Sequence, residues 1–173
     1  NGYVDDVHGW DFYNGDKSVC SYSNEGRANL SDNDNHGTHC AGTIAAVANN
    51  GVGIRGVASN INIRIMVIKA LGGANGATSS RKLIQAIQYA ASNGADIINA
   101  SWGGWVNEED TALKKAIARS GLLFVAAAGN EGKDNDKEPC FPASYNRILP
   151  NVISVGSVGQ DKHLSDFSNY GSS

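Results

Sequence analysis

The chain has 173 residues, of which 41% are hydrophobic and 18% are charged, and its formal net charge is −3. A globular domain of this length buries about 70% of its unfolded surface, so it needs no disulfide framework to fold. The slight negative charge gives no reason to expect nucleic acid as a partner. A membrane partner is not expected either, since no stretch approaches the ~18 apolar residues of a membrane span.

The elements predicted along the chain alternate between helix and strand. Residues 1–35 are rich in Asn, Asp, Gly and Ser, which predicts loops with at most one short strand. Beyond them, apolar periodicity predicts helices at 36–49, 81–93 and 107–120, and apolar runs predict strands at 61–71, 95–101, 122–129 and 151–158. In the last helix we expect Asn107 as the N-cap and Gly121 as the stop. This alternation predicts an α/β fold with a parallel sheet and helices on both faces.

The cysteines and histidines raise the questions of disulfide pairing and metal binding. The three cysteines are too few for a disulfide scaffold; Cys40 suits a buried position, and whether Cys20 and Cys140 pair stays open. His36 and His39 are three residues apart with no carboxylate between them. Zinc-binding histidines on one helical turn are normally four apart with a Glu between, so we expect no metal there.

Three glycine-rich segments follow predicted strands: "GGANGA" at 72–77, "SWGG" at 101–104 and "GNEG" at 129–132. Ligands of open parallel sheets bind beyond the carboxyl ends of the strands, where glycines let the backbone approach them closely. Taken singly, each segment is equally an ordinary turn. None is a phosphate loop, because the Lys-Ser/Thr pair of that motif is missing.

Together these segments resemble a known family. "HGTHCAGT", "KALGGANG", "INASWGG", "AAAGNEG", "FPASYNRILPNVISVGSV" and "DFSNYG" occur in the order and approximate spacing of the subtilisin-like serine proteases, across residues 32–171. The resemblance implies that residues 1–173 are part of a subtilase catalytic domain with the three-layer subtilisin-like architecture, incomplete at both ends. It implies a serine endopeptidase that cleaves peptide bonds through an acyl-enzyme.

The resemblance also assigns roles to residues. His36 corresponds to the base of the Asp-His-Ser triad, and Asn130 to the amide of the oxyanion hole. Gly72 and Gly76 correspond to one backbone edge that binds substrate in the family. Ser101, Trp102 and Gly103 correspond to a wall of the substrate pocket. Trp102 stands where many relatives have Leu, and Pro142 matches a position that is often cis.

Two family motifs are missing. The triad Asp of the family lies in "D-[ST]-G" and its Ser in "G-T-S-M-A", and neither stretch occurs here. Both residues are expected outside these 173 residues, so the chain alone is expected to be inactive. Asp5 and Asp6 precede His36 but lack that motif; with Asp32 and Asp34 they are candidates for a structural calcium site.

The resulting hypothesis is a monomeric protease that acts on peptides or proteins, needs no cofactor for catalysis and is secreted, as is usual in the family. The alternative is a subtilase scaffold that binds peptides without cleaving them. A third hypothesis is a nucleotide-binding α/β protein, but the chain lacks the glycine fingerprint and the acidic ribose-binding residue of such proteins.

Overall fold

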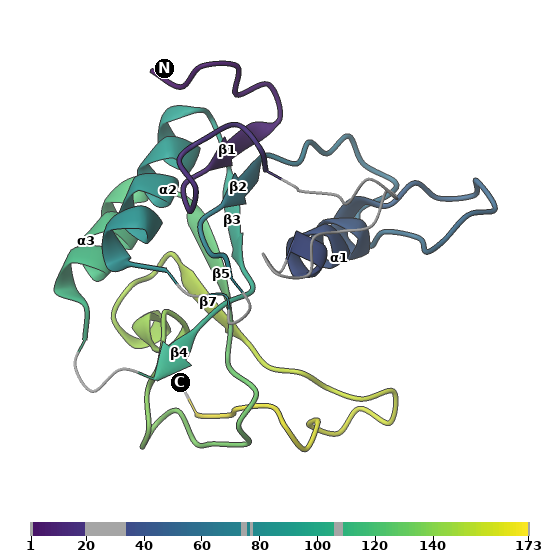
Figure 1. The fold of residues 1–173 in the computed structure, drawn as a ribbon. Coiled ribbons are helices and arrows are strands. Elements are labelled where there is room, and N and C mark those ends of the chain that lie inside the picture. The colour runs from purple at the N-terminus through teal and green to yellow at the C-terminus, as the bar shows by residue number, and fades with distance from the viewer. Residues whose placement is uncertain (1, 20–33, 74–75, 77, 106–108, 173) are drawn as a thin grey trace. The chain divides into compact units, whose positions relative to one another are not determined.

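The structure is a computed structural model of the chain that describes residues 2–19, 34–73, 76, 78–105 and 109–172. The chain divides into two units, Asn1–Ala86 and Ile87–Ser173, which we call the first and the second unit and describe one at a time. Their elements are labelled in Figure 1.

The first unit contains a short parallel pair of strands and one helix of its own. Its elements are β1 (Gly9–Asp11), α1 (Asp34–Ala45) and β2 (Val67–Lys69). Gly9 pairs with Val67, and a Cβ at Gly9 would lie 1.7 Å from the Val67 carbonyl oxygen, so only glycine allows the two strands to approach this closely.

A buried ion pair lies at the other end of the two strands of the first unit. The Lys69 ammonium is 3.5 Å from the Asp11 carboxylate, and their side chains are 7% and 0% exposed. The Asp11 carboxylate also accepts hydrogen bonds from the backbone and side-chain amides of Asn14. These hydrogen bonds offset the cost of removing the carboxylate from water. The attraction within a buried ion pair often does not offset that cost by itself.

Helix α2 (Ser80–Ser92) spans the division between the units. The Ser79 hydroxyl accepts from the backbone N–H of Lys82, as an N-cap side chain does. The apolar face is buried at helical spacing, with Leu83, Ala86, Ile87, Tyr89 and Ala90. The helix predicted for residues 81–93 is therefore confirmed.

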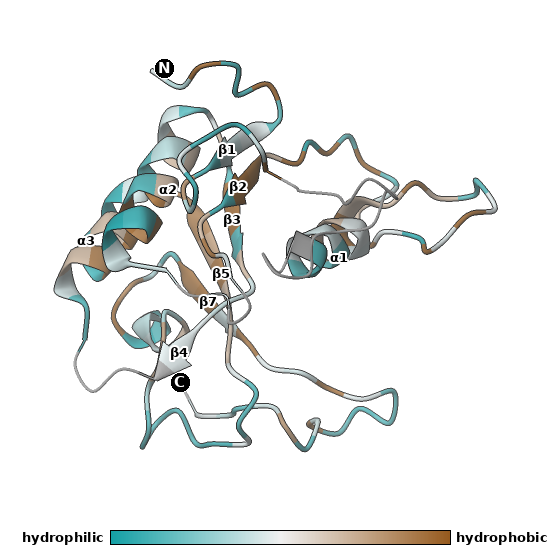
Figure 2. Cartoon of the chain, viewed as in Figure 1, coloured by the Kyte–Doolittle hydropathy of each residue, from teal (hydrophilic) through white to brown (hydrophobic). Residues whose placement is uncertain are grey.

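The second unit is built on a parallel sheet in the order β3-β5-β7. Its strands are β3 (Ile97–Ala100), β5 (Leu123–Ala127) and β7 (Val152–Val155). Figure 2 shows β5 and β7 as apolar, and Phe124 and Ala126 of the central strand are completely buried. These strands lie within the predicted apolar runs, and the predicted α/β class is confirmed.

Helix α3 (Thr111–Ser120) connects β3 to β5 across this sheet and buries Leu113 and Ile117. The Asp110 carboxylate accepts from the backbone N–H groups of Ala112 and Leu113 and is the N-cap. The predicted cap, Asn107, lies outside the described residues, and the helix begins later than predicted because Asp110 caps it. Gly121 ends it in the left-handed conformation, as predicted.

A smaller antiparallel pair, β4 (Gly104–Trp105) and β6 (Cys140–Phe141), leads into the 3-10 helix η2 (Ala143–Arg147). Tyr145 of η2 is fully buried, and its hydroxyl donates to the carbonyl oxygen of Asp110. The Phe141–Pro142 bond is cis, which confirms the expectation from the sequence.

Two predictions for the first unit were wrong in extent. The strand predicted for 61–71 forms only at 67–69, because β1, its parallel partner, pairs with those three residues alone. The helix predicted for 36–49 ends at Ala45, and Asn49 and Gly51 have positive φ in the turn beyond it. No helix among the described residues is long and apolar enough to cross a membrane.

Candidate active site

The turn at 129–132 follows the central strand of the second unit. Gly129 has a φ of 116°, a conformation open to glycine but rarely to other residues. The next residue, Asn130, is exposed, and its backbone N–H donates to the Glu131 carboxylate at 2.9 Å. The Asn130 side chain makes no hydrogen bond to any residue that the structure describes. Its carboxamide is therefore available at the carboxyl end of the sheet, where parallel sheets bind their ligands.

The segment Ser101–Gly103 emerges at the same edge. Ala100 of β3 pairs with Ala126 of β5, so the residues after both strands leave the sheet side by side. The Trp102 ring packs edge-on against Phe124, with 6.2 Å between the ring centroids. The Ser101 hydroxyl accepts from the Asn99 side chain at 2.9 Å.

Gly103 is held close to the β6 segment. A Cβ on it would lie 3.2 Å from the Phe141 carbonyl oxygen and 3.4 Å from the Cys140 sulfur. The structure therefore brings together four predicted site residues of the second unit, Ser101, Trp102, Gly103 and Asn130, along one sheet edge.

Cys140 is a free thiol that is almost completely buried beside this edge. Burial, and secondarily the negative charge of Glu131, raises the pKa of the thiol above its ordinary value. The thiol thus stays protonated at neutral pH and packs as a small apolar group. Cys20 lies outside the described residues, and Cys40 is a partly buried free thiol.

His36 lies in the first turn of α1, in the first unit, and its ring is exposed. The His36 ring makes no hydrogen bond to another described residue. His39, one turn later, is also exposed, and no α1 residue whose burial is described is fully buried. Within the part of the chain that the structure describes, this helix is therefore not closely packed.

The glycine loop after β2 is a tight turn within the first unit. Gly72 is buried, and a Cβ on it would lie 2.3 Å from the Tyr13 ring, so this position requires glycine for packing. Gly73 and Gly76 both have positive φ, and the Gly76 N–H donates to the Gly73 carbonyl. Lys82 contacts the same Tyr13, since its ammonium donates to the Tyr13 carbonyl at 2.6 Å.

Only Asp5 and Asp6 of the four candidate calcium ligands have side chains among the described residues, so the expected site stays a prediction. No group of three or more His, Cys, Asp or Glu residues that could hold a metal ion occurs among the described residues. Asp5 forms an exposed ion pair with Lys17 at 2.8 Å. Asp32 and the side chain of Asp34 lie outside the description.

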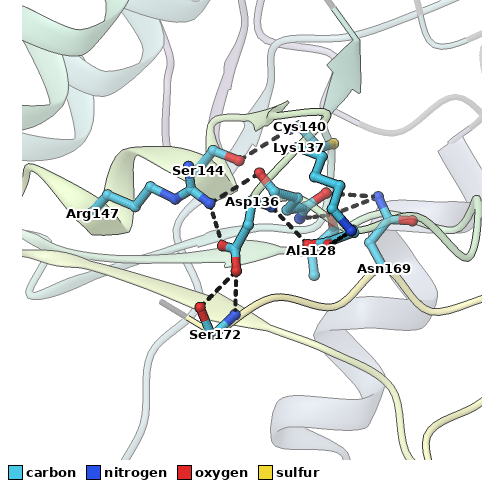
Figure 3. A network of polar contacts seen from close by, with 10 residues as sticks. Ala128, Asp136, Lys137, Cys140, Ser144, Arg147, Asn169 and Ser172 are labelled. Atoms are coloured by element: carbon cyan, nitrogen blue, oxygen red, sulfur yellow. Dashed lines mark hydrogen bonds and ion pairs between the residues drawn. The ribbon is translucent and has the colours of Figure 1, made fainter.

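Asn169 contacts the Asn130 turn but was not predicted as a site residue. The segment that contains it, "DFSNYG", carries no local chemical signal, because an asparagine next to a serine and close to a glycine is typical of a loop. In the structure Asn169 is 1% exposed, and Figure 3 shows its carboxamide directed into a polar network that includes Ala128. Only the fold could reveal this contact, which joins residues about forty positions apart.

These features define an α/β domain with an exposed carboxamide, that of Asn130, at the carboxyl end of its parallel sheet. The model of the subtilase family matches residues 6–173, and the chain belongs to this family.

Similar proteins agree with this assignment. The chain is 45% identical to the major intracellular serine protease of Bacillus subtilis (strain 168), over 81% of the chain and 43% of that protease. It is 36% identical to thermitase of Thermoactinomyces vulgaris, over 96% of the chain and 52% of thermitase. The crystal structure of a cold adapted subtilisin-like serine proteinase matches with a TM-score of 0.67 at 30% identity, over 95% of the chain and 51% of that structure.

The chain thus spans about half or less of these relatives. Two of the matched relatives are named as intracellular proteases, from Bacillus subtilis and Paenibacillus polymyxa, so membership of the family does not establish secretion.

Proposed function

We propose that the protein to which this chain belongs is a serine endopeptidase that hydrolyses peptide bonds through an acyl-enzyme. The single observation that supports this most is the carboxamide of Asn130, which is exposed at the carboxyl end of the sheet and bonds to no described residue, in a chain of the subtilase family. The triad Asp and Ser are expected outside the 173 residues, and the chain alone is expected to be inactive.

In this mechanism His36 is the general base. Its imidazole takes the proton of the serine hydroxyl as the serine oxygen bonds to the scissile carbonyl carbon. The carbon–nitrogen bond then breaks, and the same proton passes to the leaving amine. The exposed position of the His36 ring, with no hydrogen bond to a described residue, leaves it accessible for this exchange.

Asn130 has a different part in the proposal. Negative charge develops on the carbonyl oxygen in the transition state, and the Asn130 side-chain N–H is the donor that stabilises it. Ser101–Gly103 on the neighbouring strand would bind the substrate next to it, with Trp102 narrowing the wall of the pocket. Gly72 and Gly76 are proposed as the second backbone edge that binds the peptide.

No cofactor takes part in this proposal, and no step depends on calcium. The substrate is a peptide or protein, the protein acts as a monomer, and secretion is the proposed location. Detection of the mature protein outside the cell checks the last point.

The test is peptide hydrolysis by the full-length protein and its variants. His36→Ala is expected to lower kcat by about a million-fold, and Asn130→Ala by about 10² to 10³-fold; both values are known from subtilisin itself and carried over with family membership. His39→Ala, on the same exposed helix, is the matched control and should leave kcat within about threefold. A wild-type protein that binds peptides without cleaving them would instead establish a peptide-binding scaffold.

A further inference from the structure

We infer that Asn169 is the positioning residue of the oxyanion-hole turn, acting on peptide-bond hydrolysis through Asn130 without touching the substrate. This inference rests on the proposed protease function. It follows from how a single buried carboxamide bonds to the backbone on both sides of Asn130.

The oxygen of the Asn169 side chain fixes the residues after Asn130. It accepts two backbone hydrogen bonds, from Glu131 N–H at 3.0 Å and from Lys133 N–H at 3.1 Å. One carboxamide oxygen has two lone pairs, so this pair of bonds uses its whole accepting capacity.

The nitrogen of the same side chain fixes the residues before Asn130. It donates to the Ala128 carbonyl at 3.0 Å and lies within hydrogen-bonding distance of the Glu131 carboxylate and the Asn135 side-chain oxygen. Asn135 donates to the same Ala128 carbonyl at 2.9 Å. The backbone N–H of Asn169 donates to the Gly129 carbonyl at 3.1 Å. Asn169 therefore forms hydrogen bonds with residues 128, 129, 131 and 133, which flank Asn130. It forms none with Asn130 itself.

The surrounding backbone reinforces this arrangement. Gly132 N–H donates to the Phe167 carbonyl, Tyr170 N–H to the Lys133 carbonyl, and Asn135 N–H to the Tyr170 carbonyl. Because these bonds involve residues on both sides of Asn169, they hold the backbone that carries its side chain against the turn.

Gly129 shows how tightly the carboxamide is fitted. A Cβ at Gly129 would lie 2.1 Å from the Asn169 side-chain nitrogen. No side chain fits between the carboxamide and the strand end, so the turn has no room to shift toward Asn169.

Catalysis depends on such placement. An oxyanion-hole donor is effective because it is already aimed at the position that the charge will occupy, and a misplacement of about 1 Å costs about 10²-fold in rate. Removal of the Asn169 carboxamide leaves the Glu131 and Lys133 N–H groups without their partner, and the turn must rearrange to reach water. The effect should fall on kcat, since Asn169 does not face the substrate.

The test uses the full-length protein with Asn169→Ala and Asn169→Asp. The Asp variant keeps the shape and the accepting oxygen but places a carboxylate against the Ala128 carbonyl and Glu131, so it covers the case in which Asn169→Ala fails to fold. Each is expected to lower kcat by about 10- to 100-fold and to change KM less than threefold. In an Asn130→Ala background the same substitutions should lower kcat less than threefold further, because the group they position is gone.

The matched control is Asn151→Ala. The Asn151 carboxamide also bonds the backbone of the second unit, donating to the Ile117 and Leu122 carbonyls away from the turn. This variant should lose stability and keep kcat. Hydrogen exchange adds a readout that does not depend on activity: the Glu131 and Lys133 amides should exchange at least tenfold faster in Asn169→Ala than in Asn151→Ala.

The outcomes separate the two claims. An inactive wild-type protein overturns the proposed function, whatever the exchange rates. An active wild type in which the Asn169 variants keep their kcat, or lose the same factor with and without Asn130, overturns the positioning role.

Discussion

The turn that carries Asn130 and the helix that carries His36 differ in how firmly their own units hold them. The Asn130 turn is bonded on both sides by a buried side chain and by the backbone of residues 167–170. His36 lies on a helix whose described side chains are all exposed or only partly buried. The turn that carries Asn130 is thus held by buried contacts within the second unit, whereas the described residues of the first unit leave the His36 end of α1 exposed.

The strands of the two units show the same contrast. The apolar runs of the second unit form a three-stranded sheet around buried Phe124 and Ala126. The run at 61–66, in which isoleucines alternate with Asn62 and Arg64, forms no strand, and Ile61, Ile63 and Ile65 are 66%, 37% and 42% exposed. An apolar pattern becomes a strand only where a neighbouring backbone pairs with it, and β1 reaches residues 67–69 alone.

The most damaging single change that we predict for the second unit is Gly129→Ala. The new Cβ would meet the Asn169 nitrogen at 2.1 Å, in a backbone conformation that disfavours any side chain. Overpacking and backbone strain together should cost about 4 kcal/mol of unfolding free energy, measured by urea unfolding. Gly121→Ala is the control, since its φ is also positive but its surroundings are open, and it should cost only about 1 kcal/mol. Equal losses in the two variants would show that the fit against Asn169 is unimportant.

A pair of isoleucine substitutions sharpens the contrast between buried and exposed apolar runs. Ile117→Ala empties a site of 0% exposure on α3 and should cost about 3 kcal/mol. Ile61→Ala changes a side chain that is 66% exposed and should cost less than about 0.5 kcal/mol. Urea unfolding of both variants measures the difference; a loss at Ile61 as large as at Ile117 would mean that the 61–66 run is buried after all.

The smallest effect concerns Tyr145 and alkaline pH. Burial, followed by the negative charges of Glu109 and Asp110, raises the pKa of Tyr145 to about 12, from an ordinary value of 10. A group whose folded pKa is raised stabilises the fold fully below pH 10, and this contribution is lost as pH rises from 10 through 12. The loss should be roughly 2 kcal/mol.

Tyr145→Phe provides the control, because it cannot ionise. At pH 8 this variant should be about 1 kcal/mol less stable than wild type, having lost the hydroxyl bond to the Asp110 carbonyl. Above pH 11 the difference in unfolding free energy between the two proteins should shrink or change sign. Identical pH dependence of the two unfolding free energies would contradict the buried environment of the hydroxyl.

Much of the fold could be predicted from local sequence. Gly121 marks the end of α3 through a left-handed backbone conformation that glycine favours, and it was predicted correctly. The cap at Asp110 was missed because Asn107 is an equally good candidate by residue type, and only the observed bonds to Ala112 and Leu113 select Asp110.

The site residues could be predicted only where they lie within a continuous sequence motif. Asn130 and Ser101–Gly103 follow strands that the pattern predicts, so their common edge could be anticipated from parallel topology. Asn169 could not, because its importance lies in bonds to residues 128–135 that no local pattern indicates. Roles that depend on a distant contact are visible only after the chain has folded.

The central claim is that His36 serves as the base of a serine protease. Reaction of the full-length protein with a fluorophosphonate, followed by mass mapping of the labelled residue, tests it most directly. The account predicts that one serine of the wild type is labelled and that His36→Ala reacts at least about 1000-fold more slowly, while His39→Ala reacts like wild type. A wild type that is not labelled, or a His36→Ala variant that is labelled as fast as wild type, would contradict it.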